Sequence, residues 1–162
     1  MSSPELTAPS NYTSTYEHGV DEKRRVQVPS KWRPKEPGFE FTMIQWPKGV
    51  NGAIYLLVLP PSQVQELLEE IKRKQREKEI TAEEATAMRR IVFGKAQTVK
   101  LDTAGRITLP DDMAKQAAIT TESTAVLVGT GERYEIWNLE RYAAMCAEDK
   151  AMEEEALKLF SL

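Results

Sequence analysis

Residues 20–29 read VDEKRRVQVP and residues 101–110 read LDTAGRITLP, and these two stretches decide the fold. Both follow one pattern: an apolar residue and Asp, three variable positions, Arg, and then apolar, variable, apolar and Pro. Each residue of the second stretch lies 81 positions after its counterpart in the first, as Arg106 does after Arg25. A sequence that recurs at a fixed distance indicates a duplicated structural unit. We therefore expect two copies of one unit, each presenting an arginine at the same place.

The first half of each stretch predicts a tight turn. Asp21 and Asp102 suit its first position, because an Asp carboxylate accepts backbone N–H groups two residues further on. Gly105 supplies the positive φ that a tight hairpin with a bulge needs. Each carboxylate is also placed to pair with the arginine four residues later and to fix the direction of its guanidinium.

The second half of each stretch predicts a short strand. Residues 25–28 and residues 106–109 alternate polar and apolar side chains, so the apolar members share one face. Arg25 and Arg106 then lie on the opposite, solvent-exposed face. Arginine suits contact with phosphates or with guanine, since its planar fork donates two parallel hydrogen bonds.

The composition narrows the function classes. The chain has 162 residues and a net charge of −3, with basic residues crowded into 23–35 and acidic ones into 148–155. The single cysteine, Cys146, excludes an intrachain disulfide and suits a reducing compartment. No apolar run approaches the roughly 20 residues that span a bilayer, and the polar first ten residues do not resemble a signal peptide. We expect a cytoplasmic protein without a membrane partner.

The pattern along the chain divides it into three parts. Residues 1–12 are expected to be a flexible tail, 13–93 the first unit with a helical pair, and 94–162 the second unit with a C-terminal helix. Residues 53–59 predict a buried strand. Capping boxes are expected where the two paired helices begin, at Ser62 with Gln65 and at Thr81 with Glu84, and Asn138 is expected to cap one final helix.

The other candidate residues favour structural roles. The single histidine, His18, is expected in a turn or as a hydrogen-bonding residue, and Cys146 as a small buried side chain. One histidine excludes a His-rich metal site, and no carboxylates converge as an acid–base pair. We therefore expect no catalytic residues, no metal site and no cofactor.

The ordered set of motifs resembles the MraZ family of bacterial DNA-binding regulators. The residues that carry the resemblance are Tyr16, His18, Val20, Asp21, Lys23, Arg25, Val26, Val28, Pro29, Trp32 and Arg33 in the first half, and Leu101, Asp102, Gly105, Arg106, Ile107, Leu109, Pro110, Val128, Gly129, Glu135, Ile136 and Trp137 in the second. The resemblance runs from about Tyr16 to Tyr142, which is most of the chain.

The resemblance implies both a fold and a function. The fold class would be α+β, with two pseudo-symmetric swapped-hairpin, AbrB-like units that form a β-barrel with packed helices. Family members form ring-shaped homo-oligomers and bind short G-rich direct repeats in duplex DNA, upstream of the cell-division and cell-wall gene cluster, so a nucleoid-associated regulator is expected. DNA contact would come from the turns Asp21–Arg25 and Asp102–Arg106, with Lys23 and Arg24 on phosphates.

The first turn departs from the family pattern. It reads Lys23-Arg24-Arg25 where the family usually has Lys-Gly-Arg. An arginine at positive φ costs about 1–2 kcal/mol. Either this loop follows another path, or a further phosphate contact offsets the strain.

A second function class stays open. Swapped-hairpin modules also serve as protein-interaction modules, such as antitoxins that carry one repeat and a long disordered tail. Two repeats and an ordered-looking C-terminal helix favour the regulator over the antitoxin-like module.

Overall fold

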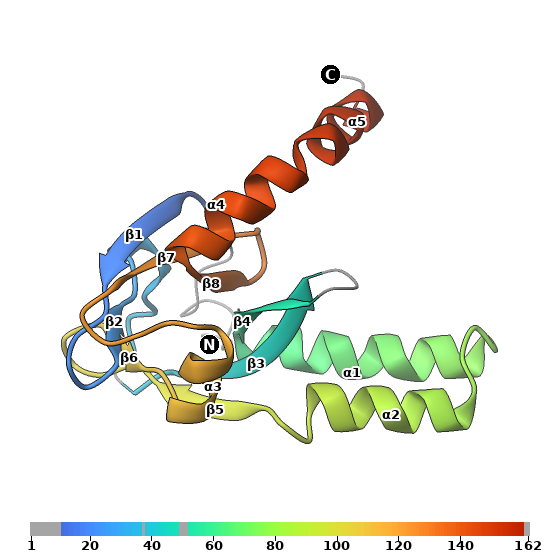
Figure 1. Cartoon of the computed structure of the whole chain (residues 1–162). Helices are drawn as coiled ribbons and strands as arrows, with labels where there is room; N and C mark the ends of the chain where they lie inside the picture. Colours follow the sequence, from blue (N-terminus) through green and yellow to red (C-terminus); the bar gives the residue numbers. More distant parts are fainter. Residues whose placement is uncertain (1–10, 37, 49–51, 161–162) are drawn as a thin grey trace.

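The computed structural model describes residues 11–36, 38–48 and 52–160. It is an α+β fold, in which antiparallel strands form the centre and helices pack outside (Figure 1). The first half contributes strands β1 (Thr15–Gly19), β2 (Arg25–Gln27), β3 (Glu40–Lys48) and β4 (Ala53–Leu59). The second half contributes β5 (Gln97–Lys100), β6 (Arg106–Thr108), β7 (Thr124–Gly129) and β8 (Tyr134–Asn138).

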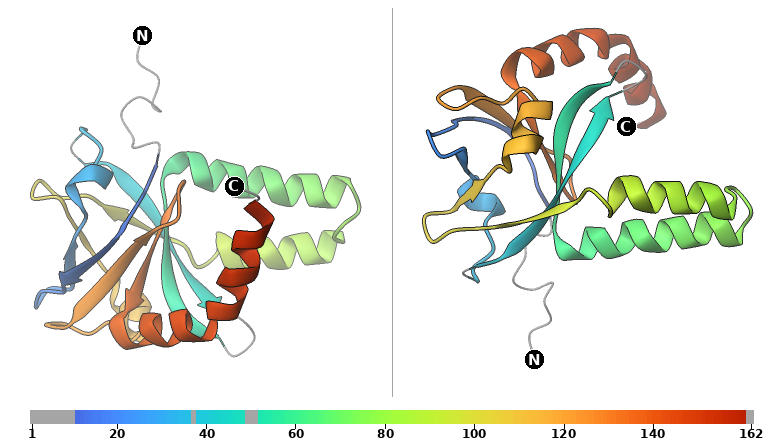
Figure 2. Two further views of the ribbon diagram at one scale, coloured as in Figure 1. Left: turned by 90° about the horizontal axis from the view of Figure 1, so that it is seen from above. Right: turned by 60° about the horizontal axis from the view of Figure 1, so that its bottom comes forward.

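The helices occupy equivalent places in the two halves. A 3-10 helix at Ser30–Trp32 follows β2, and α3 (Asp111–Gln116) follows β6. The helical pair α1 (Pro61–Arg76) and α2 (Ala82–Val92) follows β4, whereas α4 (Leu139–Glu148) and α5 (Lys150–Phe160) follow β8. Figures 1 and 2 show that α1 and α2 extend together away from the strands, and that α5 extends in another direction.

The sheet topology has the same duplication as the sequence. Six strands form one sheet in the order β1-β7-β8-β4-β3-β5, and β2 pairs with β6 in a separate ribbon. If β1, β3 and β4 are exchanged with their counterparts β5, β7 and β8, the same strand order results, read in the reverse direction. A pseudo-two-fold axis therefore passes between β4 and β8. Each half also lends its first strand to the hairpin of the other, since β1 pairs with β7 and β5 with β3.

The strand pairing does not form the expected β-barrel as one closed sheet. Among the described residues the six-stranded sheet is open, with β1 and β5 as its edges. The reason is local: the chain leaves each edge strand through a basic turn and runs back as β2 or β6, so these two strands pair with each other. The ribbon therefore stands beside the sheet instead of closing it.

Apolar side chains bury both faces of the sheet. On one face the ribbon packs through Val26 and Ile107, which are fully buried, with Trp32 and Tyr134 in the same cluster. On the other face α1, α2 and α4 cover a second cluster that contains Trp137. The strand expected at residues 53–59 is β4, and its side chains enter both clusters.

Some helix boundaries confirm the expected caps and others do not. Thr81 and Glu84 form the capping box of α2, since Thr81 Oγ1 accepts from the Glu84 N–H at 3.0 Å. The box expected at Ser62 is wrong, because α1 begins at Pro61 with no side-chain cap. Proline at the first helical position is already set in φ and lacks an N–H that needs a cap.

The C-terminal helix is divided. Asn138 caps α4 as expected by accepting from the Arg141 N–H, but α4 ends at Glu148 with Asp149 as its C-cap, and α5 follows. The Asp149 carboxylate lies 2.7 Å from Lys48 Nζ, which ties the break to the end of β3. Cys146 on α4 was expected to be a buried side chain, and the structure buries it only in part. No helix among the described residues is long and apolar enough to cross a membrane.

Tyr12 is not part of a flexible tail. Its side chain is 1% exposed, and its N–H donates to the Gly131 carbonyl. Its ring lies in the aromatic cluster around Trp32 and Tyr134. The expected tail of residues 1–12 is therefore wrong at Tyr12, and residues 1–10 lie outside the described part of the chain. His18, expected in a turn or as a hydrogen-bonding residue, lies within β1 opposite Ala125, and its buried Nε2 has no hydrogen-bond partner among the described residues.

Candidate nucleic-acid interface

The two Asp turns have the same hydrogen-bonded frame. Asp21 Oδ1 accepts from the N–H groups of Lys23 at 2.9 Å and Arg25 at 2.8 Å. Asp102 Oδ1 accepts from the equivalent N–H groups, of Ala104 at 2.9 Å and Arg106 at 2.8 Å. The carboxylate thus closes each turn in the way that the sequence predicts.

The second carboxylate oxygen of each Asp holds the arginine. Arg25 Nε donates to Asp21 Oδ2 at 2.6 Å, and Arg106 Nε donates to Asp102 Oδ2 at 3.1 Å. Both arginine side chains remain about one-third exposed. Within the described part of the chain, the terminal nitrogens of these two guanidiniums donate to no other group. The pairing therefore fixes the direction of each side chain and leaves its outer edge available to a ligand.

The pKa of both carboxyls lies below the usual range for Asp. For Asp21 the largest cause is the hydrogen bond from the Arg25 backbone N–H, and the Arg25 guanidinium adds to it. For Asp102 desolvation opposes the charged form, but hydrogen bonds from the backbone and side chain of Arg106 outweigh it and lower the pKa. Both ion pairs therefore remain formed at neutral pH.

The ribbon brings the two arginines onto one surface. β2 and β6 run antiparallel with Arg25 opposite Thr108 and Gln27 opposite Arg106. Arg25 and Arg106 are diagonal neighbours, and such residues have Cα atoms within roughly 8 Å of each other. Both lie on the face opposite to the buried Val26.

Each turn is anchored by the other half of the molecule. The Val28 N–H donates to the Gly105 carbonyl at 2.9 Å, and the Leu109 N–H donates to the Arg24 carbonyl at 2.8 Å. Gln27 Nε2 also donates to the Ala104 carbonyl at 3.0 Å. These bonds cross between the repeats, so the relative position of the two turns is fixed.

Arg24 follows the path of the glycine that it replaces. Its φ is 61°, and that of Gly105 is 80°, so the alternative of a different loop path is wrong. Its side chain turns toward the other half, where Arg24 Nε donates to the Leu109 carbonyl at 3.1 Å. A terminal nitrogen also lies 4.0 Å from the Asp111 carboxylate. This bond to Leu109 is an interaction within the protein, and the expected contact of Arg24 with a phosphate stays a prediction.

Arg33 is a basic residue at this site that the sequence analysis did not assign to it. A Cβ added to Gly105 would lie 2.2 Å from Arg33 Nη1 and 2.6 Å from its Cδ. The side chain of Arg33 therefore lies directly on the second turn, although the residue belongs to the first repeat. The available signal was its place in the basic stretch 23–35; its contact with residue 105 depends on tertiary structure.

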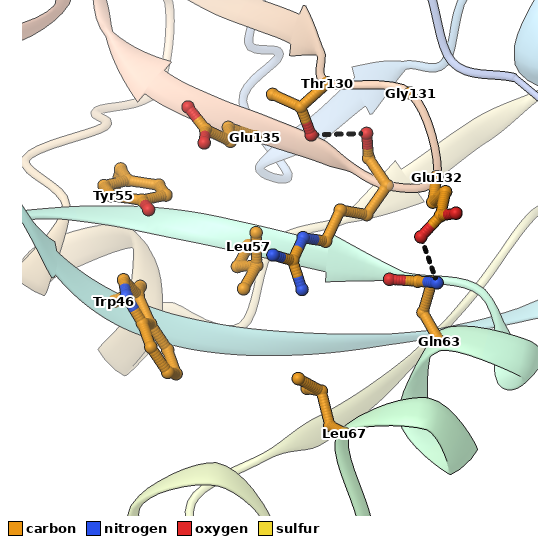
Figure 3. A pocket seen from close by; sticks show the side chains of 10 residues that line it. Trp46, Tyr55, Leu57, Gln63, Leu67, Thr130, Gly131, Glu132 and Glu135 are labelled. Atoms are coloured by element: carbon orange, nitrogen blue, oxygen red, sulfur yellow. Dashed lines mark hydrogen bonds between the residues drawn. The ribbon is translucent and has the colours of Figure 1, made fainter. Parts of the chain in front are cut away.

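A separate pocket of about 520 Å³ lies at the start of α1 (Figure 3). Trp46, Tyr55, Gln63, Arg133 and Glu135 contribute to its lining. Burial raises the pKa of the Glu135 carboxyl, which accepts a hydrogen bond from Trp137 Nε1 at 2.8 Å. None of the residues of the two Asp turns lines this pocket. No group of three or more potential metal-ligating side chains occurs in the residues that the structure describes.

Comparison with known proteins agrees with the resemblance. A family model described as "MraZ protein, putative antitoxin-like" matches residues 92–160. The protein "Transcriptional regulator MraZ" of Clostridium tetani is 32% identical over 131 residues, which cover 81% of this chain and 84% of that protein. The chain belongs to the MraZ family.

Other family members show the same coverage. The proteins with the same name from Clostridium acetobutylicum and Leuconostoc mesenteroides are 32% and 28% identical over 131 and 137 residues. These segments cover 81% and 85% of this chain, and 84% and 87% of those proteins. The matches to this family thus extend over both halves of the duplicated fold.

Proposed function

We propose that this protein is a transcriptional regulator that binds duplex DNA in a sequence-specific manner through its two Asp-x-x-x-Arg turns. The observation that carries the proposal is the matched pair of turns, in which Asp21 and Asp102 hold Arg25 and Arg106 by Nε on one face of a ribbon. The names of the relatives, all transcriptional regulators, support it.

The chemistry of the outer face fits a DNA groove. The major groove admits a two-stranded β-ribbon, and an arginine fork bonds guanine O6 and N7 in a bidentate manner. With Nε engaged by the Asp, the two terminal nitrogens of each guanidinium would be available to a ligand. Two such forks on one rigid ribbon would read guanines at adjacent positions. This accords with the G-rich direct repeats that the resemblance implies.

The surrounding basic residues would contact the phosphates. Lys23 is exposed beside the first turn, Arg24 is one-third exposed there, and Arg33 lies on the second turn. Phosphate contacts position a protein on DNA without reading its sequence. We therefore assign Lys23, Arg24 and Arg33 to affinity, and Arg25 and Arg106 to specificity.

One subunit offers few contacts with DNA, and this favours assembly into a homo-oligomer. With a net charge of −3, a single chain gains little from general electrostatic attraction to DNA. A ring-shaped homo-oligomer would place several ribbons on successive direct repeats and raise the overall affinity through effective concentration. Binding of this kind would associate the protein with the nucleoid.

The antitoxin-like module remains the second candidate, because the description of the matching family model includes that term. In that case the ribbon would hold a protein partner, and the arginines would be structural or would pair with acidic side chains. The swapped-hairpin classification of the fold belongs to both candidates, and it is supported by the exchange of β1 and β5 between the halves.

The deciding experiment is a binding assay on DNA from upstream of the protein's own gene. We expect the double variant Arg25→Ala/Arg106→Ala to lose specific binding and to keep its circular dichroism spectrum, because both side chains lie outside the core. The matched control is Lys72→Ala/Arg76→Ala, which removes two positive charges from the exposed end of α1. A folded double variant that binds with unchanged affinity and guanine preference would refute the proposal and favour the interaction module.

A further inference from the structure

The pocket at the start of α1 is built by elements from both halves of the chain. Trp46 of β3 and Tyr55 of β4 lie opposite each other in their ladder, so both side chains are on the same face of the sheet. α1 contributes Leu67, the β7–β8 turn contributes Arg133, and β8 contributes Glu135. The volume of about 520 Å³ lies within the range of small-molecule sites, roughly 300–1,000 Å³.

One part of the pocket wall is apolar and held in place by the core. Figure 3 shows Trp46, Leu57 and Leu67 around the same space. The Tyr55 ring stacks on the buried Trp137, with ring centroids 4.5 Å apart and an interplanar angle of 9°. This stacking fixes the Tyr55 ring before any ligand arrives. The wall therefore suits an apolar group of about the size of one aromatic ring.

Two opposite charges line the pocket without pairing with each other. Within the described part of the chain, Arg133 forms no ion pair and its guanidinium donates no hydrogen bond. Glu135 accepts one bond, from Trp137 Nε1 to its Oε1, and its Oε2 has no donor among the same residues. Both side chains are partly buried. Burial raises the pKa of the Glu135 carboxyl, and the positive charge of Arg133 opposes that rise without forming an ion pair. Partly buried charges of this kind gain from a ligand that supplies their counterparts.

Gln63 is a buried polar residue that turns an unused acceptor to the pocket. Its side chain is 6% exposed, and its Nε2 donates to Glu66 Oε2 at 2.7 Å and to Glu132 Oε2 at 2.9 Å. Only the amide nitrogen can donate to carboxylates, so these two bonds fix the orientation of the amide. Figure 3 shows the Gln63 oxygen turned to the pocket. No described residue donates to this oxygen, and an unsatisfied acceptor of this kind indicates a bound water or ligand.

We propose that this pocket binds a free amino acid with an apolar side chain. Its carboxylate would lie on the guanidinium of Arg133, its ammonium at Glu135, and its side chain against Trp46, Leu57 and Leu67. The planar fork of an arginine suits a carboxylate, because it donates two parallel hydrogen bonds. A simple anion or a simple cation would pair with only one of the two charges, whereas a zwitterion pairs with both. The proposal goes beyond DNA binding and does not depend on it, since the Asp turns do not line the pocket.

The first test is titration calorimetry of the full chain without DNA, with three probes that share one ring. L-phenylalanine has both charged groups, phenethylamine lacks the carboxylate, and hydrocinnamate lacks the ammonium. We expect phenylalanine to bind at one site per chain. Each truncated probe should bind about 10- to 100-fold more weakly, because it loses one charged hydrogen-bonding group. Glycine, which has no apolar side chain, should not bind.

Two variants that each remove one charge then identify the contacts. Glu135→Gln keeps an oxygen for Trp137 Nε1 and should weaken phenylalanine and phenethylamine about 10- to 100-fold, with no loss for hydrocinnamate. Arg133→Gln should give the converse result, with a loss for phenylalanine and hydrocinnamate and none for phenethylamine. The matched controls, Glu83→Gln and Arg90→Gln, remove the same charges from exposed positions on α2 and should bind all three probes like the unmodified protein.

Three results would overturn the proposal. If phenethylamine binds as tightly as phenylalanine, the pocket is a site for organic cations and the carboxylate has no partner in it. If both variants weaken all three probes equally, Arg133 and Glu135 only maintain the shape of the pocket. If none of phenylalanine, leucine and tryptophan binds the unmodified protein at millimolar concentration, the pocket is not an amino-acid site. All of these measurements are made without DNA, so their failure is separate from failure of the DNA-binding proposal.

Discussion

The first and second basic turns share one backbone path but have different residues at its positive-φ position. Both have an Asp that accepts two N–H groups and holds an Arg by its Nε. The position with positive φ is Arg24 in the first turn and Gly105 in the second. The comparison teaches that the Asp determines the path of this turn. Glycine only lowers the cost of that path, and a tertiary hydrogen bond can offset the cost when another residue takes its place.

The two turns also differ in the source of their second guanidinium. In the first turn Arg24 comes from the turn itself, whereas in the second Arg33 comes from the other repeat and lies over Gly105. Each turn thus has one arginine fixed by an Asp and one further arginine nearby. A similar placement of guanidiniums results from a sequence that is not symmetric at these positions, although Lys23 of the first turn corresponds to the uncharged Ala104 of the second.

The prediction with the largest expected effect concerns whether the two turns contribute equally to DNA binding. Arg25→Ala and Arg106→Ala should each weaken binding to the cognate site by about 1–3 kcal/mol and relax its guanine preference, because each removes one bidentate contact. Lys23→Ala should instead weaken binding evenly across sequences and reduce the salt dependence by about one counterion. Fluorescence anisotropy on the cognate site and on a site without guanines measures both. If only one arginine matters, the turns are equivalent in structure but not in function.

The second prediction tests the difference at Gly105. Gly105→Ala should destabilise the protein by about 1–2 kcal/mol, the cost of a side chain at positive φ, and should also displace the Arg33 side chain. In a protein that also carries Arg33→Ala, Gly105→Ala should cost only the free energy of a side chain at positive φ, because no Arg33 side chain is left to displace. Chemical denaturation of the two single variants and the double variant gives the coupling between the sites.

A coupling of zero would mean that Arg33 moves aside freely and is not held on the second turn. Arg33→Lys is the matched control for charge. It keeps a positive charge near the turn but lacks the planar group that lies on Gly105, so it separates the loss of packing from the loss of charge.

Features that depend on neighbouring residues in the chain could be predicted from the sequence. The Asp turns, β4 and the capping box of Thr81 follow from side-chain alternation and from hydrogen bonds within four residues, and the structure has all of them. The DNA-contact roles of Arg25 and Arg106 remain a prediction.

Features that depend on distant contacts could not be predicted in this way. The burial of Tyr12 requires the β7–β8 turn, the position of Arg33 requires Gly105, and the break at Asp149 accompanies its ion pair with Lys48. The pairing of β1 with β7 is similar, because nothing in the alternation of a strand specifies which partner it takes.

The smallest expected effect comes from Arg24→Gly, which makes the first turn like the second. Relief of the positive φ should gain about 1–2 kcal/mol, whereas the flexible glycine costs about 0.5–1 kcal/mol and the lost bond to the Leu109 carbonyl about 0.5–1.5 kcal/mol. These terms nearly cancel, so we expect the free energy of unfolding to change by less than about 1 kcal/mol in urea denaturation.

Arg24→Lys is the informative companion to that variant. It keeps the positive charge and the positive φ but loses the Nε donor, so it should be less stable than both the unmodified protein and Arg24→Gly. If Arg24 also contacts a phosphate, Arg24→Gly should reduce the salt dependence of DNA binding by about one counterion, and Arg24→Lys should preserve it. A gain above about 2 kcal/mol for Arg24→Gly exceeds the full relief of strain at one residue. It would mean that the bond to Leu109 offsets nothing, and that the first turn retains an arginine only for its ligand.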